Sequence, residues 1–391
     1  MASRTAVLSL RLSHYRSWLG ASIETGGEDI AFYGPNGAGK TNILEAVSML
    51  SPGRGLRRAG SDELVRRPEG LGWKITAEVE TAEGEVEIST QVEGAESARR
   101  SVVIDDKPAA QLALGRLIRI IWLTPAMDRL WTETAGERRR FLDRICLGFD
   151  PSHGETALAY EKAMRGRNRL LKDGGGEDAW LSALEGQMAR AGARIARVRA
   201  EVLERLTEAQ ETASDAPKSL FPKADLAILG AMETRFHRVI RDSSAPGDDL
   251  DLLEIEEAAD FARALAVGRA RDTAAGRTLE GPHRSDLEAV YAAKAMPARA
   301  CSTGEQKALL ISLCLANARA LGDSTGSAPI ILLDEVAAHL DADRRRALYG
   351  EIAALGCQSW MTGTGPELFE GSAARRFEVC EEDGASALCA A

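Results

Sequence analysis

The sequence is poor in aromatic side chains, which make up 5% of its 391 residues. Proteins that bind single-stranded nucleic acid without sequence preference stack bases on aromatic rings, so a broad stacking platform is not expected. The chain also lacks an excess of positive charge, since its formal net charge is −10. A protein that coats nucleic acid by charge alone is therefore excluded, and any basic surface has to be local.

Long apolar segments and paired cysteine motifs are absent as well. No run of about eighteen apolar residues occurs, so we expect no membrane-spanning helix. The first residues lead into a strand-like segment rather than a secretory signal. The six cysteines form no Cys-x-x-Cys pair. The sequence therefore predicts a cytoplasmic protein without a membrane partner, whose cysteines are reduced thiols.

The chain does contain a phosphate-binding loop. A short apolar segment, residues 29–33, precedes the loop, and an apolar helix that starts at Asn42 follows it. In such a unit, backbone N–H groups and the positive end of the helix surround a polyphosphate. We predict an ATP site in which Lys40 reaches the β- and γ-phosphates, the Thr41 hydroxyl ligates Mg²⁺ and Asn42 also contacts the nucleotide. The loop matches G-x-x-x-x-G-K-[ST] at every fixed position and consists of Gly34, Pro35, Asn36, Gly37, Ala38, Gly39, Lys40 and Thr41.

A second motif, near residue 330, ends in two acids. Residues 329–333 form an apolar segment that is followed by Asp334 and Glu335. In phosphate-loop ATPases such a strand lies beside the strand that feeds the loop, so its end points at the metal. We predict that Asp334 holds the Mg²⁺ ion through its water shell. Glu335 is the predicted general base, and with Lys40 it completes the predicted catalytic pair.

A third motif opens a helix. Ser302, Thr303 and Gly304 precede a strongly helical segment at residues 307–320. Such a helix start binds anions, although an ordinary helix cap has the same composition. The motifs follow one another along the chain as phosphate loop, helical segment, this helix start, Asp–Glu strand and Asp341. That order resembles the ABC-type ATPase superfamily. That resemblance implies two heads that sandwich two ATP molecules, with Ser302 and Gly304 acting on the other head's nucleotide and Asp341 at the seam.

The rest of the chain divides into α/β and helical regions. Alternating segments predict strands within residues 5–33 and an antiparallel meander within 73–105. Residues 126–213 are helical in pattern, and a glycine triplet at 174–176 predicts the joint of an antiparallel helix pair. We expect an α/β ATPase head with a mixed sheet and flanking helices. Its predicted parts are residues 1–125, a helical arm or lid insertion at 126–275, and residues 276–391.

Within that superfamily the chain resembles the RecF family of recombination-repair proteins, over blocks that run from about residue 5 to 370. The resemblance implies a cytoplasmic ATPase of DNA replication and repair that binds junctions between duplex and single-stranded DNA. With RecO and RecR, such proteins help load RecA at gaps, as part of the SOS response to DNA damage. It also implies weak, DNA-stimulated hydrolysis of ATP and an ATP-dependent homodimer. The blocks are Tyr15-Arg16-Ser17, GPNGAGKTNILE from Gly34, Pro52-Gly53-Arg54, ERRRFLD from Glu137, RNRLLK from Arg167, GPHRSDL from Gly281, STGEQKALL from Ser302, LDEVAAHLD from Leu333, and Thr362-Gly363-Thr364.

Some features depart from these families, and alternatives stay open. No histidine follows the Asp–Glu strand, no glutamine ends the strand at residues 118–123, and Ser285 replaces a second acid of the RecF pattern. The alternatives are a transporter-type ATPase subunit, an SMC-like ATPase and a phosphate-loop kinase.

Candidate DNA contacts are arginine clusters, each of which could equally be a solvated helix face. The clusters are Arg54, Arg57 and Arg58; Arg138, Arg139 and Arg140; Arg165, Arg167 and Arg169; and Arg190, Arg194, Arg197 and Arg199.

Overall fold

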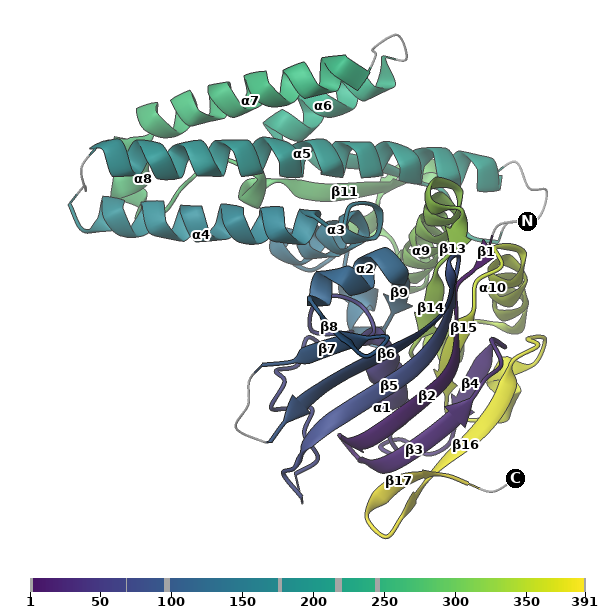
Figure 1. The fold of residues 1–391 in the computed structure, drawn as a ribbon. Coiled ribbons are helices and arrows are strands. Elements are labelled where there is room, and N and C mark those ends of the chain that lie inside the picture. The colour runs from purple at the N-terminus through teal and green to yellow at the C-terminus, as the bar shows by residue number, and fades with distance from the viewer. Residues whose placement is uncertain are drawn as a thin grey trace. The chain divides into compact units, whose positions relative to one another are not determined.

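The computed structural model describes residues 3–67, 69–94, 99–174, 178–214, 220–242 and 247–389. The chain divides into two compact units (Figure 1). The first contains Met1–Asp128, Ala216–Phe221 and Leu310–Ala391, and the second contains Arg129–Asp215 and Pro222–Leu309. The first is a mixed α/β unit and the second is mainly helical, which confirms the predicted fold class.

The first unit is built on a six-stranded sheet with the order β17-β16-β4-β15-β14-β9. Neighbouring strands from β16 to β9 are parallel, so their carboxyl ends lie at one edge. All four residues of β14 are buried, as expected of a parallel strand covered on both faces. The strands are β4 (Ile30–Tyr33), β9 (Ile120–Leu123), β14 (Ile330–Leu333), β15 (Ser359–Gly363), β16 (Arg375–Glu382) and β17 (Ala385–Leu388).

The position of β14 corrects one prediction. The Asp–Glu strand was expected beside the strand that feeds the phosphate loop, but β15 lies between β4 and β14. The segment at residues 359–363 is buried and apolar enough to occupy that central position. Because all three strands run parallel, the end of β14 still lies at the same edge of the sheet as the loop.

A second sheet of the first unit is antiparallel, with the order β3-β2-β5-β6-β7-β8. β5 and β6 pair along ten residues each, which confirms the predicted meander. The strands are β2 (Ala6–Tyr15), β3 (Trp18–Glu24), β5 (Gly72–Thr81), β6 (Gly84–Glu93), β7 (Ser101–Ile104) and β8 (Lys107–Ala109). The unit also contains α1 (Lys40–Ser48), α2 (Leu114–Leu117), α10 (Ala342–Ala354) and a short pair of β1 (Ser3–Arg4) with β13 (Ser327–Ala328).

The C-terminal segment contains two strands, β16 and β17. β16 and β17 form an antiparallel hairpin at the edge of the central sheet. This pairing brings Cys380 and Cys389 together, and the two are joined by a disulfide. The prediction of six reduced thiols is therefore wrong for this pair, because the β16–β17 hairpin, which the cysteine spacing did not reveal, places their Cα atoms 6.0 Å apart. Cys146, Cys301, Cys314 and Cys357 are buried and lie outside this disulfide.

The second unit contains a long helical pair, α4 and α5, which lie side by side (Figure 1). The predicted glycine joint falls between them, and part of it lies outside the described residues. α5 has 37 residues and therefore a length of roughly 55 Å. A core that includes Tyr160, Met188, Phe236 and Phe261 holds these helices together. The helices of the unit are α3 (Ala135–Phe149), α4 (His153–Lys172), α5 (Asp178–Ser214), α6 (Ala231–Arg241), α7 (Gly247–Val267) and α8 (Arg269–Ala275).

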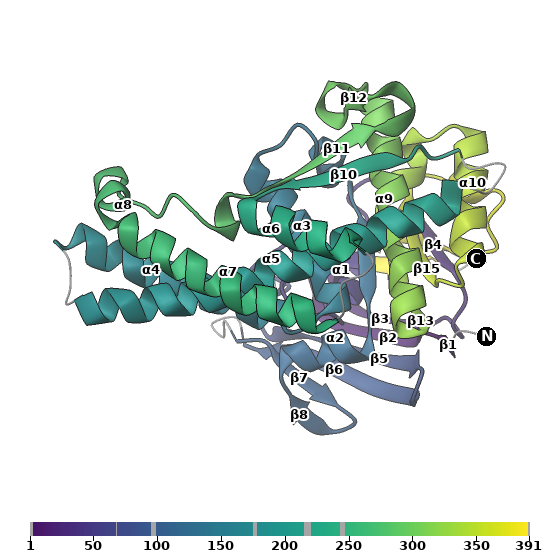
Figure 2. The ribbon, with the colours of Figure 1, turned by 90° about the horizontal axis from the view of Figure 1, so that it is seen from above.

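A small sheet, β10-β11-β12, completes the second unit. β10 (Ala224–Leu229) pairs with β11 (Asp286–Tyr291) over six residues, and Figure 2 shows the two strands side by side. β12 (Met296–Pro297) follows. This pairing keeps residues after 275 with the helices, and the second unit extends to Leu309. The boundary falls within α9 (Thr303–Thr325). In the part of the chain that the structure describes, no helix is long and apolar enough to cross a membrane.

Candidate nucleotide-binding site

The phosphate loop joins β4 to α1, and two of its glycines are needed for close backbone approaches. Gly34 has φ +143°, and a Cβ there would lie 2.2 Å from the carbonyl oxygen of Val379. Gly39 has φ +103°, and its Cβ would lie 2.2 Å from Ser386 Oγ. Both residues that approach the loop belong to the β16–β17 hairpin. The hairpin thus supports the loop, a role that the sequence analysis did not assign to it.

Lys40 is the first residue of α1 and its side chain is buried. The ammonium group donates hydrogen bonds to the carbonyl oxygens of Gly34 and Pro35, each at 2.8 Å. Burial lowers the pKa of Lys40, while the carboxylates of Glu335 and Asp334 raise it. The ammonium therefore lies within the loop and in the field of both acids. A phosphate group can replace the two carbonyl contacts, which is the geometry expected of a nucleotide-binding lysine.

A chain of hydrogen bonds links the loop to the end of β14. Thr41 Oγ1 donates to Asp334 Oδ1 at 2.7 Å, and Thr362 Oγ1 donates to the same oxygen at 2.8 Å. The backbone N–H of Glu335 donates to Thr362 Oγ1 at 3.0 Å. Hydroxyl and carboxylate oxygens are the ligands that Mg²⁺ prefers. Thr41 and Asp334 therefore fit a magnesium ion, and Thr362 orients the carboxylate.

Glu335 has an unusual backbone conformation. Its φ is +53°, in the left-handed region that few non-glycine residues occupy. It is also the cap of the short helix η6 (Val336–His339), so the chain turns sharply directly after Asp334. Backbone strain of this kind persists where the surroundings enforce it. The bond from its N–H to Thr362 is one such constraint.

A second layer of polar side chains holds the loop from behind. Ser17 Oγ accepts hydrogen bonds from Asn42 Nδ2 at 2.7 Å and from Ser386 Oγ at 2.6 Å. Trp18 Nε1 donates to the carbonyl oxygen of Gly39 at 3.1 Å. Asn42 was predicted to contact the nucleotide, and in this structure its amide also bonds Ser17. Ser17 lies in one of the blocks of the family resemblance, but no sequence signal pointed to Ser386.

The neighbouring Arg16 explains another part of that block. Its guanidinium donates two hydrogen bonds to the carboxylate of Glu45 in α1, at 2.8 and 2.9 Å. The Glu45 side chain is fully buried. A paired Arg–carboxylate contact of this geometry is rigid as well as strong. It fixes α1, and therefore Lys40 and Thr41, against the β2–β3 turn.

The predicted signature residues lie at the start of α9, where Ser302, Thr303 and Gly304 are all exposed. Ser302 and Glu305 form a capping box: Glu305 Oε2 accepts from Ser302 N and Oγ, both at 2.8 Å. A Cβ added to Gly304 would meet no atom within 4 Å. Asp341 is also exposed and caps α10 by accepting from Arg344 N at 2.8 Å. These groups serve as helix caps in the single chain and remain accessible to a second molecule.

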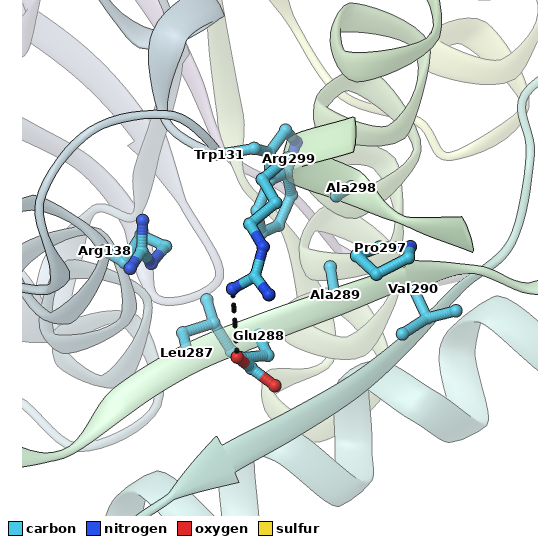
Figure 3. Close-up of a pocket in the computed structure, with 9 residues that line it drawn as sticks. All are labelled: Trp131, Arg138, Leu287, Glu288, Ala289, Val290, Pro297, Ala298 and Arg299. Carbon is cyan, nitrogen blue, oxygen red and sulfur yellow. Dashed lines mark ion pairs between the residues drawn. The ribbon is translucent and has the colours of Figure 1, made fainter. Parts of the chain in front are cut away.

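A small cavity lies in the second unit beside the start of α9 (Figure 3). Its walls include Trp131, Leu287 and Arg299, and Arg299 pairs weakly with Glu288 at 3.7 Å. Trp131 Nε1 donates to the carbonyl oxygen of Gln306 in the first turn of α9. The cavity volume is about 80 Å³, whereas small-molecule sites measure about 300–1,000 Å³. It is too small to be a second nucleotide site.

The structure corrects the candidate DNA contacts. Arg167 is fully buried between Glu185 and Asp272, and Arg199 is buried between Asp143 and Glu233. Others are engaged in ion pairs: Arg194 with Asp150, Arg197 with Asp251 and Glu254, Arg138 with Asp286, and Arg140 with Glu137. Except for Glu137, which lies three residues from Arg140, the acidic partners are distant in sequence, so the charge pattern could not distinguish these structural pairs from free cations. Arg165 and Arg169 are exposed.

The site and the fold around it define an ATPase head of the phosphate-loop class, and the comparisons with known proteins agree. The family model RecF/RecN/SMC N terminal domain matches residues 6–385. The chain is 47% identical over 371 residues to the DNA replication and repair protein RecF of Mesorhizobium japonicum, covering 94% of each protein. It is 46% identical over 386 residues to RecF of Rhizobium etli, covering 97% of this chain and 99% of that one. The chain therefore belongs to the RecF family of DNA replication and repair proteins.

A solved structure supports the fold. The structure of the recombination mediator protein RecF-ATPrS in the RecFOR pathway matches with a TM-score of 0.81 and 22% identity, over 100% of both chains. At this identity the match concerns the fold alone. It includes both the ATPase head and the helical insertion, because the whole of each chain is covered.

Proposed function

We propose that the chain binds ATP with Mg²⁺ at the phosphate loop, dimerises when ATP is bound and acts on DNA in the cytoplasm. The observation that carries this proposal is the hydrogen-bond chain from Thr41 through Asp334 and Thr362 to Glu335. It joins the proposed metal ligands to the backbone N–H of Glu335, the residue whose carboxylate would take a proton from water. Bound Mg²⁺ would neutralise part of the phosphate charge.

The proposed hydrolysis is slow, is stimulated by DNA and serves to time release of the dimer. Lys40 holds the phosphates, and Glu335 accepts a proton from the attacking water. The RecF proteins that the chain resembles are DNA replication and repair proteins. We therefore place the chain in recombinational repair, at junctions of duplex and single-stranded DNA, where it helps load RecA with RecO and RecR. The full-length resemblance to RecF gives the transporter alternative no support.

The dimer is tested by a substitution at Ser302. Its side chain is exposed, and arginine there would place bulk and charge where the other head's nucleotide is proposed to bind. We expect Ser302→Arg to bind ATP with unchanged affinity but to remain monomeric when ATP is added. Light scattering with ATP, with and without gapped DNA, measures this. An ATP-induced dimer of Ser302→Arg as stable as that of the unmodified chain would overturn the sandwich arrangement.

The DNA contact is proposed for one face of α4. Lys162, Arg165, Arg169 and Lys172 are exposed and spaced by three or four residues, so they form one stripe. The pairs of Arg165 with Glu161 and Arg169 with Asp173 lie at the surface, where ion pairs contribute little and phosphates can replace them. Such a stripe would position the chain on DNA without reading the base sequence.

The stripe predicts a change in salt dependence. Replacing Lys162, Arg165 and Arg169 by alanine should lower the slope of log affinity against log salt by about 3, because each lost phosphate contact removes about one released counterion. Fluorescence anisotropy with gapped DNA at several salt concentrations measures the slope. Arg263→Ala is the control, since Arg263 is exposed on α7 but pairs with Asp260. An unchanged slope in the triple variant would remove α4 from the DNA interface.

A further inference from the structure

The loop between β11 and β12 places a lysine beside the start of α9. We call this start, formed by Ser302, Thr303 and Gly304, the signature turn. Lys294 ends the short helix η4 (Ala292–Lys294), and Ala295 follows it with φ +47°, a sharp left-handed turn. Tyr291 and Met296 pair across the hairpin, so the loop is tightly closed. In this position the Lys294 ammonium pairs with Glu305 Oε1 and lies 5.5 Å from the centre of the Tyr291 ring.

Glu305 thus divides its two oxygens between two roles. Oε1 is bound by Lys294, and Oε2 accepts both the N–H and the hydroxyl of Ser302. The Lys294 side chain is 50% exposed, and surface pairs of this kind contribute little to folding. Stabilisation of the fold therefore does not explain why the loop holds Lys294 against Glu305.

The proposed dimer creates a charge problem at this turn. A serine has one hydroxyl proton, and Glu305 holds that of Ser302 in this structure. The γ-phosphate of the other head must compete with a carboxylate for it. Lys294 beside the carboxylate and the Ser302 contacts hold the pKa of Glu305 at about 2, so the group is ionised at neutral pH. Without a counter-charge, the carboxylate would also repel the incoming phosphates.

We propose that Lys294 is a positioning residue for the ATP contact between the two heads. It cancels the charge of Glu305 and weakens the hold of that carboxylate on the Ser302 hydroxyl, while Glu305 keeps the serine oriented. This role rests on the proposed ATP-dependent dimer. It acts twice in a symmetric dimer, because each head presents its own turn to the other head's nucleotide.

The test compares four variants by sedimentation velocity with ATP. We expect Lys294→Ala to weaken the ATP-bound dimer about tenfold per site, and about a hundredfold for two sites. Lys294→Arg keeps the charge and should behave like the unmodified chain. Glu305→Gln should dimerise at least as well, and the double variant Lys294→Ala/Glu305→Gln should recover most of the lost affinity, because no uncompensated carboxylate remains.

Two controls separate this role from others. Arg299→Ala removes a nearby cation that is 71% exposed and should leave the dimer unchanged. Binding of ATP to the monomer should be the same in all variants, since the proposed role of Lys294 concerns only the contact with the other head's nucleotide.

The outcomes are distinct. A Lys294→Ala dimer as tight as the unmodified one, or a double variant as weak as Lys294→Ala, overturns the role of Lys294 and leaves the dimer standing. Absence of an ATP-induced dimer in the unmodified chain overturns the proposed function, and the role of Lys294 with it. Recovery in the double variant, together with an unchanged dimer in Arg299→Ala, supports the charge argument.

Discussion

Glu335→Gln is expected to lower the rate of ATP hydrolysis by about 10²–10⁴-fold, because an amide cannot accept a proton from the attacking water. The substitution conserves size, and the contact of residue 335 with Thr362 is made by the backbone N–H, so the turn should be retained. ATP should therefore stay bound and the dimer should persist. Release of phosphate measures the first effect, and light scattering over time measures the second.

Lys40→Ala is the comparison that separates binding from hydrolysis. It removes the ammonium group that is held in the loop by Gly34 and Pro35, so ATP binding itself should weaken and no dimer should form. If Glu335→Gln hydrolysed ATP at the unmodified rate, another group would have to be the base. The proposed role of the Asp334–Glu335 pair would then be reduced to metal binding.

Arg167→Ala is expected to destabilise the second unit by about 3–5 kcal/mol, the usual cost of removing one partner from a buried ion pair. Arg167 is fully buried and donates to Glu185 at 3.0 Å, to Asp272 at 2.7 Å and to the carbonyl oxygen of Leu265 at 2.7 Å. Its removal leaves the Asp272 carboxylate buried without its strongest partner. Urea unfolding followed by circular dichroism measures the loss.

Arg169→Ala is the matched control, since the same residue type lies two positions further along α4. Its side chain is 85% exposed and its pair with Asp173 is 4.0 Å long, so the free energy of unfolding should change by less than about 0.5 kcal/mol. For DNA binding we expect the opposite order. Arg169→Ala should weaken the affinity more than Arg167→Ala, because Arg169 belongs to the proposed stripe. Equal unfolding midpoints for the two variants would contradict the structural role of Arg167.

The sequence revealed the parts of the site that are local in the chain. The loop from Gly34 to Thr41 and the pair Asp334 and Glu335 are each contiguous, and their chemistry follows from residue type and order. The strand–loop–helix and the antiparallel meander could be predicted for the same reason, since hydrophobic periodicity is a local signal. The helical pair α4 and α5 followed from composition and spacing.

The remaining parts depend on contacts between distant segments. Nothing near Thr362 or Ser386 in the sequence shows that they reach Asp334 and Ser17, because those contacts require β15 and the β16–β17 hairpin to flank β4. The arginines show the same limit. Arg167 lies on the buried face of α4 with Ala163 and Leu171, but nothing near it in the sequence shows that Glu185 and Asp272 pair with it there.

The central position of β4 has a consequence for how the protein is made. Both strands that pair with β4, β15 and β16, come from the last part of the chain to be synthesised. Ile30 and its partner Trp360 are separated by roughly 330 residues, which take about 20–70 seconds to translate. Until then the strand that carries the phosphate loop has no neighbour in its sheet. We therefore expect a nascent chain to acquire nucleotide affinity only near the end of translation. Ribosome-bound chains that end before residue 359 should fail to retain ATP.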